Sequence, residues 1–321
     1  MTDAFIQVQN LTRKFDISSP WLNRMLKFEK RKILTAVENV SFNIEKGSTY
    51  ALVGESGSGK STIARMLVGL LPPSAGRVLI NGIDPTTNDV DEQTQLRRNI
   101  QMVFQDPYAS LNPRWRVGDI VGEPLDALLG MSGSALTNRV SELLDKVGMS
   151  ARDATKFPHE FSGGQRQRIG IARALASDPE FIVCDEPTSA LDVSVQAQVL
   201  NLMRDLQRDL GLTYLFITHD LAVVRYMADQ IGVLYLGRLV ESAPSQELFD
   251  QPKHPYTQML LEAAPHIDGF GREHSTEGGE IPDPINRPSG CHYHPRCPHV
   301  MAKCKSESPS MSDEKPVACF L

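Results

Sequence analysis

The stretch GESGSGKS, residues 54–61, decides the fold. It fits the pattern G-x-x-x-x-G-K-[ST] of a phosphate-binding loop, and it joins the apolar run TYALVG to the helical run STIARMLVGLL. A glycine-rich turn between a strand and a helix directs backbone N–H groups and the positive end of the helix toward an anion. We therefore predict that this loop binds the phosphates of a nucleotide.

The residue types in the loop suit distinct tasks. Glycine allows the backbone to curl around the β-phosphate, Lys60 neutralises β- and γ-phosphate charge, and the hydroxyl of Ser61 can ligate Mg²⁺. The predicted nucleotide contacts in this segment are Gly54, Glu55, Ser56, Gly57, Ser58, Gly59, Lys60, Ser61 and Thr62.

A second element of the nucleotide site is the segment FIVCDEPTSALD, residues 181–192. An apolar strand delivers two acids to its end. We expect Asp185 to hold Mg²⁺ and Glu186 to act as the general base that polarises the attacking water. Cys184, within the strand, is interpreted as a small core residue.

A third motif, FSGGQRQR at residues 161–168, precedes the acidic strand and opens a helix. Its predicted nucleotide contacts are Ser162, Gly163, Gly164 and Gln165, which offer a hydroxyl, an amide and N–H donors at a helix N-terminus. The chain already has one phosphate loop. A second group of hydrogen-bond donors therefore suggests that this segment contacts a nucleotide held by another subunit.

The order of apolar and polar runs predicts an α/β fold with a mostly parallel sheet covered by helices. Alternating stretches at Phe5–Val8 and Ala36–Ile44 predict edge or antiparallel strands. Residues 106–165 are expected to form a helical subdomain inside a nucleotide-binding domain of residues 1–262. Residues 263–321, rich in Pro, Gly, His and Cys, are expected to form an irregular extension that needs a metal or a partner to order it.

Together these motifs resemble the nucleotide-binding subunit of an ABC transporter, from about residue 4 to residue 262. FSGGQ resembles the signature L-S-G-G-Q, and SALD at residues 189–192 resembles the D-loop that crosses the dimer. The resemblance implies that Gln105 is a further Mg²⁺ ligand, senses the attacking water and touches the permease. It also implies that His219 contacts the γ-phosphate and that Phe15 stacks on adenine. The implied fold combines an antiparallel β subdomain, a RecA-like core and a helical subdomain.

The resemblance also implies how such a subunit works. Two subunits form a head-to-tail dimer, and each ATP lies between one subunit's phosphate loop and the other's Ser162-type signature. ATP closes the dimer because it contacts both faces, and closure moves the Q-loop region and the helical segment against a coupling helix of the permease. Because Glu186, His219 and the signature are present, we expect an active ATPase.

Three segments resemble the dipeptide, oligopeptide and nickel group of ABC import ATPases: HPYT at 254–257, SLNPR at 110–114 and SALDVSVQAQVLNLM at 189–203. For that group we expect a heterodimer with a related ATPase, two permease subunits and an external solute-binding protein. The expected location is peripheral, on the cytoplasmic face of the inner membrane. Peptides are the expected solute, with nickel and short oligosaccharides as alternatives.

Four of the five cysteines crowd the C-terminus: Cys291, Cys297, Cys304 and Cys319. Thiolates suit zinc or an iron–sulfur cluster, but their spacing fits neither a common ferredoxin pattern nor a C-x-x-C zinc ribbon. The peptide-importer group carries a similar cysteine tail that holds a [4Fe–4S] cluster, and the resemblance implies the same here. A mixed Cys/His zinc site with His292, His294 or His299 and metal-free thiols remain alternatives.

Composition limits the remaining function classes. The chain has 321 residues, 41% of them hydrophobic, and a formal net charge of −6, which offers no electrostatic argument for nucleic acid as a partner. Alternatives to an importer are a soluble ABC protein of DNA repair or translation, an exporter subunit and a non-catalytic binding module. The basic segment 21–32 predicts either a solvated hairpin insertion or a patch that meets lipid headgroups or a membrane partner.

Overall fold

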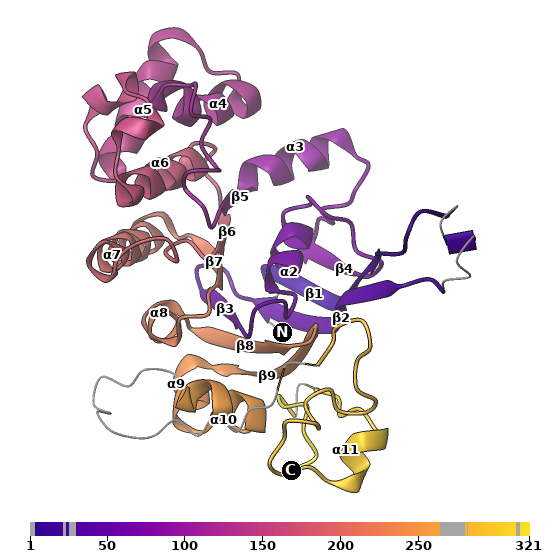
Figure 1. The fold of residues 1–321 in the computed structure, drawn as a ribbon. Coiled ribbons are helices and arrows are strands. Elements are labelled where there is room, and N and C mark those ends of the chain that lie inside the picture. The colour runs from indigo at the N-terminus through magenta and orange to yellow at the C-terminus, as the bar shows by residue number, and fades with distance from the viewer. Residues whose placement is uncertain (1–3, 22–23, 26–29, 264–279, 281, 313–314) are drawn as a thin grey trace.

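A computed structural model gives the structure of the protein. It describes residues 4–21, 24–25, 30–263, 280, 282–312 and 315–321. Figure 1 shows the arrangement of the chain: a central pair of sheets, a group of helices at one end and a C-terminal extension at the other.

The centre of the molecule is a six-stranded sheet with the strand order β5-β6-β7-β3-β8-β9. All neighbouring pairs are parallel except β8 and β9, which are antiparallel. The strands β3, β6 and β7 are buried along their whole length, as expected for a sheet covered on both faces. The bounds are β3 Thr49–Val53, β5 Ile100–Val103, β6 Phe181–Asp185, β7 Thr213–Ile217, β8 Gln230–Tyr235 and β9 Arg238–Pro244.

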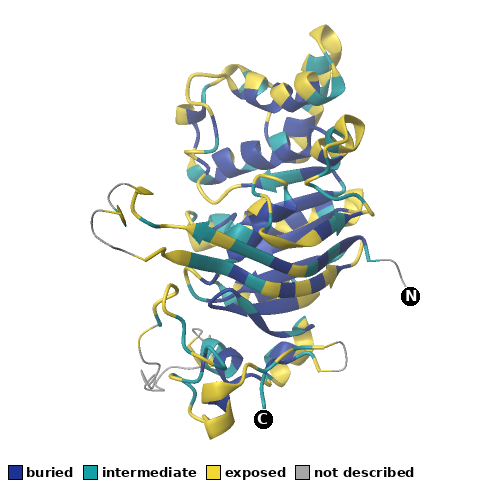
Figure 2. Cartoon of the chain, turned by 90° about the vertical axis from the view of Figure 1, so that its right-hand side faces the viewer, coloured by how far each residue is buried: buried dark blue, intermediate teal, exposed yellow. Residues whose placement is uncertain are grey.

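Helices connect these strands, which confirms the predicted α/β class with a mostly parallel sheet. Figure 2 shows the buried strands between partly exposed helices. In α7, the apolar residues Val199, Leu200, Met203 and Leu206 recur at helical spacing and form the buried side. The bounds are α2 Lys60–Leu67, α3 Val90–Asn99, α7 Val193–Leu210 and α8 Leu221–Met227.

A three-stranded antiparallel sheet, ordered β2-β1-β4, packs against the other side of α2. Its strands are β1 Ile6–Asp16, β2 Ile33–Ile44 and β4 Ala75–Ile80. The two predicted antiparallel strands are present, but both are longer than expected. The extra length of β1 is polar and irregular, with register shifts against β2 between Val8 and Lys14, so simple alternation did not reveal it.

The helical group lies at one end of the molecule (Figure 1). Its elements are α4 Val117–Leu129, α5 Gly133–Lys146, η1 Ala151–Thr155, η2 Pro158–Glu160 and α6 Gly163–Leu175. Their apolar sides form one core together with residues of α7 and β6. Helix α6 shares this core with α4 and α5, and the predicted bounds of the helical subdomain stay a prediction.

The C-terminal extension lies against β9 and the helices α9 Ser245–Asp250 and α10 Pro255–Glu262. Within its described part, turns predominate around a single short helix, α11 Ala302–Ser306. Residues near the C-terminus run beside β9, where the Ser242 N–H donates to Pro316 O and the Ala318 N–H donates to Val240 O. These backbone bonds fix the end of the chain to the central sheet.

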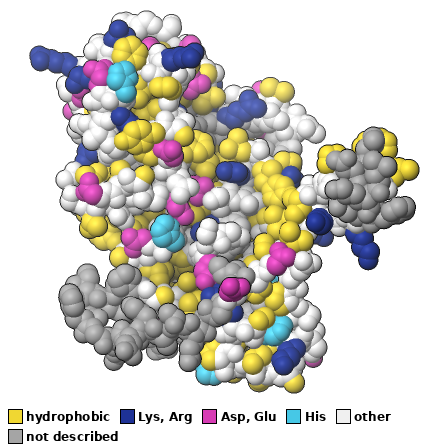
Figure 3. All heavy atoms as spheres, in the orientation of Figure 1, with side chains coloured by type: hydrophobic (Ala, Val, Ile, Leu, Met, Phe, Trp, Pro, Cys, Tyr) yellow, Lys and Arg dark blue, Asp and Glu magenta, His cyan; other side chains and the backbone are white. Residues whose placement is uncertain are grey.

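Among the described residues, no helix is both long enough and apolar enough to cross a membrane. Charges of both signs are interspersed over the face shown in Figure 3. The basic segment 21–32 lies partly outside the described residues. At its described positions, Trp21 and Met25 are 67% and 72% exposed. Both interpretations of this segment remain predictions.

Candidate nucleotide-binding and hydrolysis site

The phosphate loop and the acidic strand end meet because β3 and β6 flank β7 in the same parallel sheet. Both strands point the same way, so the residues that follow them lie at one edge. There the Ser61 hydroxyl donates to Asp185 Oδ1 at 3.0 Å. Burial raises the pKa of Asp185, and the Ser61 hydrogen bond opposes that shift. Two of the three predicted Mg²⁺ ligands, Ser61 and Asp185, are therefore neighbours, and both supply the oxygen atoms that Mg²⁺ prefers.

Lys60 stands at the start of α2 and is only 6% exposed. Its ammonium donates to Gly54 O at 2.7 Å and Glu55 O at 2.9 Å. Burial lowers the pKa of Lys60, while the carboxylates of Glu186, Asp185 and Glu55 act in the opposite direction. A buried ammonium held by two loop carbonyls is placed to exchange them for phosphate oxygens.

Two glycines are required by the close approach of the loop to the rest of the molecule. A Cβ on Gly54 would lie 2.1 Å from Leu234 O, and one on Gly59 would lie 2.4 Å from Ala36 O. Both residues also have positive φ, at 149° and 106°. Any side chain here would displace the loop from its seat on β8 and β2.

The predicted base, Glu186, lies at the centre of a cluster of three residues far apart in sequence. The Gln105 amide donates Nε2–H to Glu186 Oε2 at 2.8 Å, and His219 Nδ1 lies 3.3 Å from Glu186 Oε1. Gln105 follows β5 and His219 follows β7, the two strands on either side of β6. The parallel sheet thus brings the three predicted catalytic residues together.

The backbone of Glu186 has φ +47°, a conformation that side-chain-bearing residues adopt infrequently. Its N–H donates to Ile217 O at 2.8 Å, which fixes the residue to the end of β7. Gln105 and His219 contact the two carboxylate oxygens, and the Glu186 side chain is only 19% exposed. A fixed, partly buried carboxylate beside Mg²⁺ ligands is suited to orient a water molecule.

The signature segment begins α6. The Ser162 hydroxyl accepts from the Gln165 N–H, and the Gln165 side chain accepts from the Ser162 N–H, so the two residues form a capping box. Ser162 and Gln165 are exposed, whereas Gly164 is buried. A Cβ on Gly164 would lie 2.2 Å from Val195, so this glycine allows α6 to pack on α7. Gly163, the first residue of α6, is partly exposed beside Ser162.

The predicted D-loop and Phe15 keep their assignments as predictions. In the predicted D-loop, Asp192 caps α7 by accepting from Val195 N–H, and the Ser189 hydroxyl donates to Glu186 O. Phe15 lies near the end of β1, where the Arg13 guanidinium lies 4.7 Å from the centre of its ring. Stacking of adenine on Phe15 stays a prediction.

The structure gives Glu55 a role that sequence reasoning missed. Its N–H donates to the hydroxyl of Tyr256 at 2.9 Å, and its carboxylate forms two hydrogen bonds with Arg296 at 2.8 and 2.9 Å. Glu55 therefore uses its N–H and side chain to hold other parts of the chain. The segment HPYT was a signal for Tyr256, but no pattern pointed to Arg296.

The HPYT segment has a local explanation. His254 caps α10 by accepting the Tyr256 N–H on Nδ1 at 3.0 Å, and Pro255 occupies the first helical position. Burial lowers the pKa of His254 to about 4, so the imidazole is neutral and can accept this bond. The cap directs Tyr256 into the core, where it is fully buried and reaches the phosphate loop.

The four late cysteines line one small pocket at the surface of the extension. His294 and His299 share this pocket, whereas His292 lines a separate cavity. Burial, together with the neighbouring cysteines, raises the pKa of Cys291 and Cys297. Among the residues that the structure describes, no group of three or more His, Cys, Asp or Glu side chains is close enough to hold a single metal ion. Cys184 is fully buried in β6, apart from this pocket.

Comparison with known proteins agrees with this geometry. Residues 37–189 match the family model described as ABC transporter, and residues 240–304 match the C-terminal region of oligopeptide/dipeptide transporters. A probable peptide ABC transporter ATP-binding protein, y4tS of Sinorhizobium fredii, is 47% identical over 100% of this chain and 91% of its own length. The chain belongs to the family of ABC transporter ATP-binding proteins.

Other relatives of this ABC ATPase carry the same kind of name. The dipeptide transport ATP-binding protein DppF of Escherichia coli is 44% identical over 97% of this chain and 94% of its own length. Among solved structures, the ATP-binding cassette MJ0796, a dimer in a post-hydrolysis state bound to ADP and Pi, aligns with a TM-score of 0.64 and 32% identity. That alignment covers 75% of this chain and 98% of the other. These matches confirm the predicted family, the cassette fold and the class of enzyme, an ATPase.

Proposed function

We propose that this ATPase drives the import of di- and oligopeptides through a membrane permease. The observation that carries the enzymatic part is the Gln105–Glu186–His219 cluster next to the phosphate loop. The solute is inferred from relatives named for peptide and dipeptide transport. Nickel and short oligosaccharides are not favoured, since the quoted relatives carry names of peptide transporters.

The proposed catalytic roles follow from position. Lys60 and the loop N–H groups hold the β- and γ-phosphates, and Ser61 and Asp185 hold Mg²⁺. Glu186 polarises the attacking water, and His219 contacts the γ-phosphate. Gln105 shares the Glu186 carboxylate with His219, so a shift of the β5 end reaches the base directly. Bound Mg²⁺ supplies Lewis-acid stabilisation of the charge that develops on the phosphate oxygens.

We further propose that two ATPase subunits enclose each nucleotide. Ser162 and Gln165 are exposed at the start of α6, in the helical group, whereas the phosphate loop lies in the central body. Because these exposed hydrogen-bond donors lie away from the phosphate loop of their own chain, they are suited to bind ATP that is held by the partner subunit. By analogy with its group, the partner is a related ATPase, which gives a heterodimer on the cytoplasmic face of the inner membrane.

A groove of about 490 Å³ offers the proposed seat for the permease. It lies between the end of α2, α3, β5 and α4, and its walls include Leu70 and Phe104, which are 64% and 40% exposed. Phe104 directly precedes Gln105, so a segment bound here is one residue from the Glu186 cluster. A permease helix bound in this groove would contact Phe104 and would therefore respond to movements of Gln105 in the nucleotide site. An external solute-binding protein would deliver the peptide to the permease.

Leu70→Glu should abolish co-purification of this chain with its permease, because it replaces an exposed apolar side chain of the groove by a charge that a docked helix would bury. Binding of ATP to the isolated chain should stay within about twofold of wild type, since a surface substitution away from the loop changes stability little. Leu210→Glu, on a residue that is 43% exposed at the end of α7, is the matched control and should retain the permease. Equal retention by both variants would argue against this groove as the docking site.

We propose that Cys291, Cys297, Cys304 and Cys319 hold a [4Fe–4S] cluster. All four side chains line one pocket, and thiolates are the ligands such clusters use. A cluster is several atoms across, so its four thiolates lie farther apart than the ligands of one zinc ion. The proposed role is structural, because the cluster would tie together turns that have little core of their own.

Cys297→Ser should lose most of the bound iron and the visible absorbance of the anaerobically purified protein. Cys184→Ala should keep both, since Cys184 lies in β6 away from the pocket. Iron and zinc are measured per chain by elemental analysis. Stoichiometric zinc without visible absorbance in the wild-type protein would refute the cluster.

The transport function is tested with the complete complex reconstituted in vesicles. Dipeptide with its solute-binding protein should stimulate ATP hydrolysis severalfold, whereas nickel or a short oligosaccharide should not. Stimulation by one of those solutes instead would reassign the cargo and leave the ATPase role intact.

A further inference from the structure

The C-terminal extension grips the phosphate loop directly. Arg296 stands between Cys291 and Cys297, and its guanidinium meets the Glu55 carboxylate through two parallel hydrogen bonds of 2.8 and 2.9 Å. The Arg296 side chain is only 5% exposed, and that of Glu55 is 23% exposed. Bidentate pairs of this kind fix orientation as well as distance, and loss of one partner leaves the other charge buried.

Three tyrosines form the seat for this ion pair. Tyr235, Tyr256 and Tyr293 pack with ring centres 4.6 to 5.4 Å apart, and they come from β8, α10 and the extension. The Arg296 guanidinium lies 5.8 Å from the ring centres of Tyr235 and Tyr293. The hydrogen bond to Glu55 raises the pKa of Arg296, so the guanidinium stays charged. The contact is thus a preformed joint between three parts of the chain.

All the polar groups of Glu55 are held at once. Its N–H donates to Tyr256, its carboxylate accepts from Arg296, and its carbonyl accepts from Lys60 at 2.9 Å and from the Ser58 N–H at 3.2 Å. Two of these anchors come from outside the cassette's own loop and helix. When the Lys60 ammonium binds phosphate oxygens, its hydrogen bond to the Glu55 carbonyl is lost. The bonds to Tyr256 and Arg296 then keep Glu55 in place.

We propose that Arg296 and Tyr256 are positioning residues for the phosphate loop, and that through Arg296 the C-terminal extension sets the affinity of the loop for nucleotide phosphates. This inference rests on the proposed nucleotide site. Neither residue touches the nucleotide. Both act by keeping the loop in its binding conformation, and apparent affinity falls in proportion to the fraction of molecules that have this conformation.

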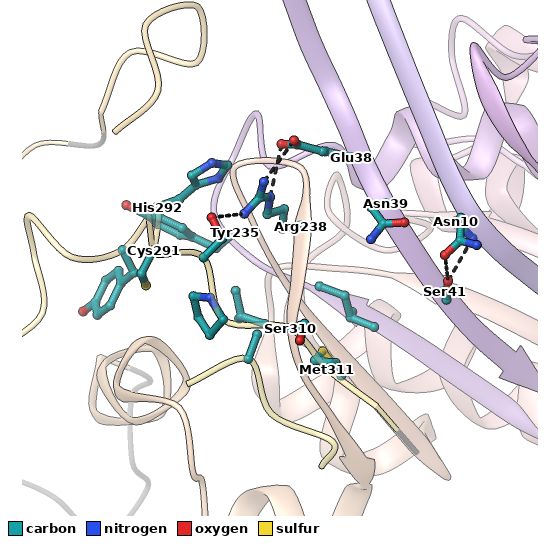
Figure 4. Close-up of a pocket in the computed structure, with 16 residues that line it drawn as sticks. Asn10, Glu38, Asn39, Ser41, Tyr235, Arg238, Cys291, His292, Ser310 and Met311 are labelled. Carbon is teal, nitrogen blue, oxygen red and sulfur yellow. Dashed lines mark hydrogen bonds and ion pairs between the residues drawn. The ribbon is translucent and has the colours of Figure 1, made fainter. Parts of the chain in front are cut away.

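The extension has other attachments, so Arg296 is not needed merely to hold it on. Figure 4 shows the pair between Glu38 of β2 and Arg238 of β9. Arg287 of the extension pairs with the same carboxylate at 2.6 Å. The chain end also bonds to β9 through Ser242 and Ala318. Arg287 is 12% exposed and is therefore a matched control: an extension arginine paired with a cassette carboxylate away from the loop.

The test is titration of the full-length chain with a fluorescent ATP analogue in the presence of Mg²⁺. Arg296→Gln should weaken binding by about tenfold, equivalent to a loop that is competent in about a tenth of molecules. Tyr256→Phe removes the acceptor for the Glu55 N–H and should weaken binding in the same direction. Arg287→Gln should bind within about twofold of wild type, because sites that share no partner with the loop act independently of it.

Three further measurements distinguish a specific effect on the phosphate loop from a loss of overall stability. Arg296→Lys, which keeps the charge, should recover part of the affinity that Arg296→Gln loses. Combining Arg296→Gln with Glu55→Gln should cost less than the sum of the two single changes. The thermal midpoints of Arg296→Gln and Arg287→Gln should fall by similar amounts while only the first loses affinity.

Three results would overturn the proposal. If Arg296→Gln bound ATP like the wild type while Lys60→Met lost binding, the positioning role of Arg296 would be rejected and the nucleotide site retained. Equal loss of affinity in Arg296→Gln and Arg287→Gln would assign the effect to general stability. Wild-type affinity in Lys60→Met would instead overturn the nucleotide site itself, and the positioning role with it.

Discussion

Replacing Glu186 by glutamine should lower ATP turnover by about 100- to 10,000-fold, the range over which a positioned general base acts. The amide of glutamine has nearly the same size and can still meet Gln105 and His219, so the fold of the cluster is retained. It has no negative charge with which to polarise water. The variant should therefore bind ATP and Mg²⁺ but fail to convert them, and the dimer that ATP closes should persist.

The measurement is release of phosphate by the complete complex, with nucleotide binding followed in parallel. Glu180→Gln is the matched control, because Glu180 precedes the same strand, is partly exposed and pairs with Lys46 at 2.8 Å. It should keep wild-type turnover, since surface pairs contribute little. Turnover in Glu186→Gln within a few-fold of wild type would reject the assignment of Glu186 as the base.

Replacing Lys60 by methionine should weaken ATP binding by about 10- to 100-fold. The ammonium is buried, and hydrogen bonds to charged groups contribute about 1.5–3 kcal/mol each. Methionine keeps most of the chain length but supplies no donor for Gly54 O, Glu55 O or phosphate oxygens. Hydrolysis should fall at least as far as binding at low ATP concentration.

Binding is measured by titration with labelled ATP and Mg²⁺. Lys46→Met serves as the control, because Lys46 is exposed and forms a surface ion pair. It should bind ATP as the wild type does. If both lysine variants bound equally well, the segment 54–61 would not be the phosphate site.

The sequence predicted those parts of the site that depend on strand order. Motifs at the ends of apolar strands meet whenever the strands are parallel and adjacent, so Gln105, Glu186 and His219 came together as expected. The phosphate loop needed glycine at positions 54 and 59, and the structure explains both by the backbone that approaches them. These features depend on local chemistry and a common sheet topology.

Other features depend on tertiary contacts that leave no local pattern. The polar second half of β1 pairs with β2 through register shifts, so alternation ended at Val8 in the sequence but the strand did not. The helical group packs in one core with residues of α7 and β6, a set of contacts that no local sequence pattern indicates. Arg296 is 241 positions from Glu55, and a single arginine among prolines and histidines carries no spacing signal. Glu55 was predicted only as one of the nucleotide contacts of the loop, and the contact of its side chain with the extension was not foreseen.

The central claim is that the Glu186 site powers peptide import. It is tested most directly by uptake of a labelled dipeptide in cells whose own copy of this chain is replaced by the wild type or by Glu186→Gln, each expressed to the same level. The account predicts uptake with the wild type and almost none with Glu186→Gln, while Glu180→Gln restores it. Equal uptake with Glu186→Gln and with the wild type would contradict the account.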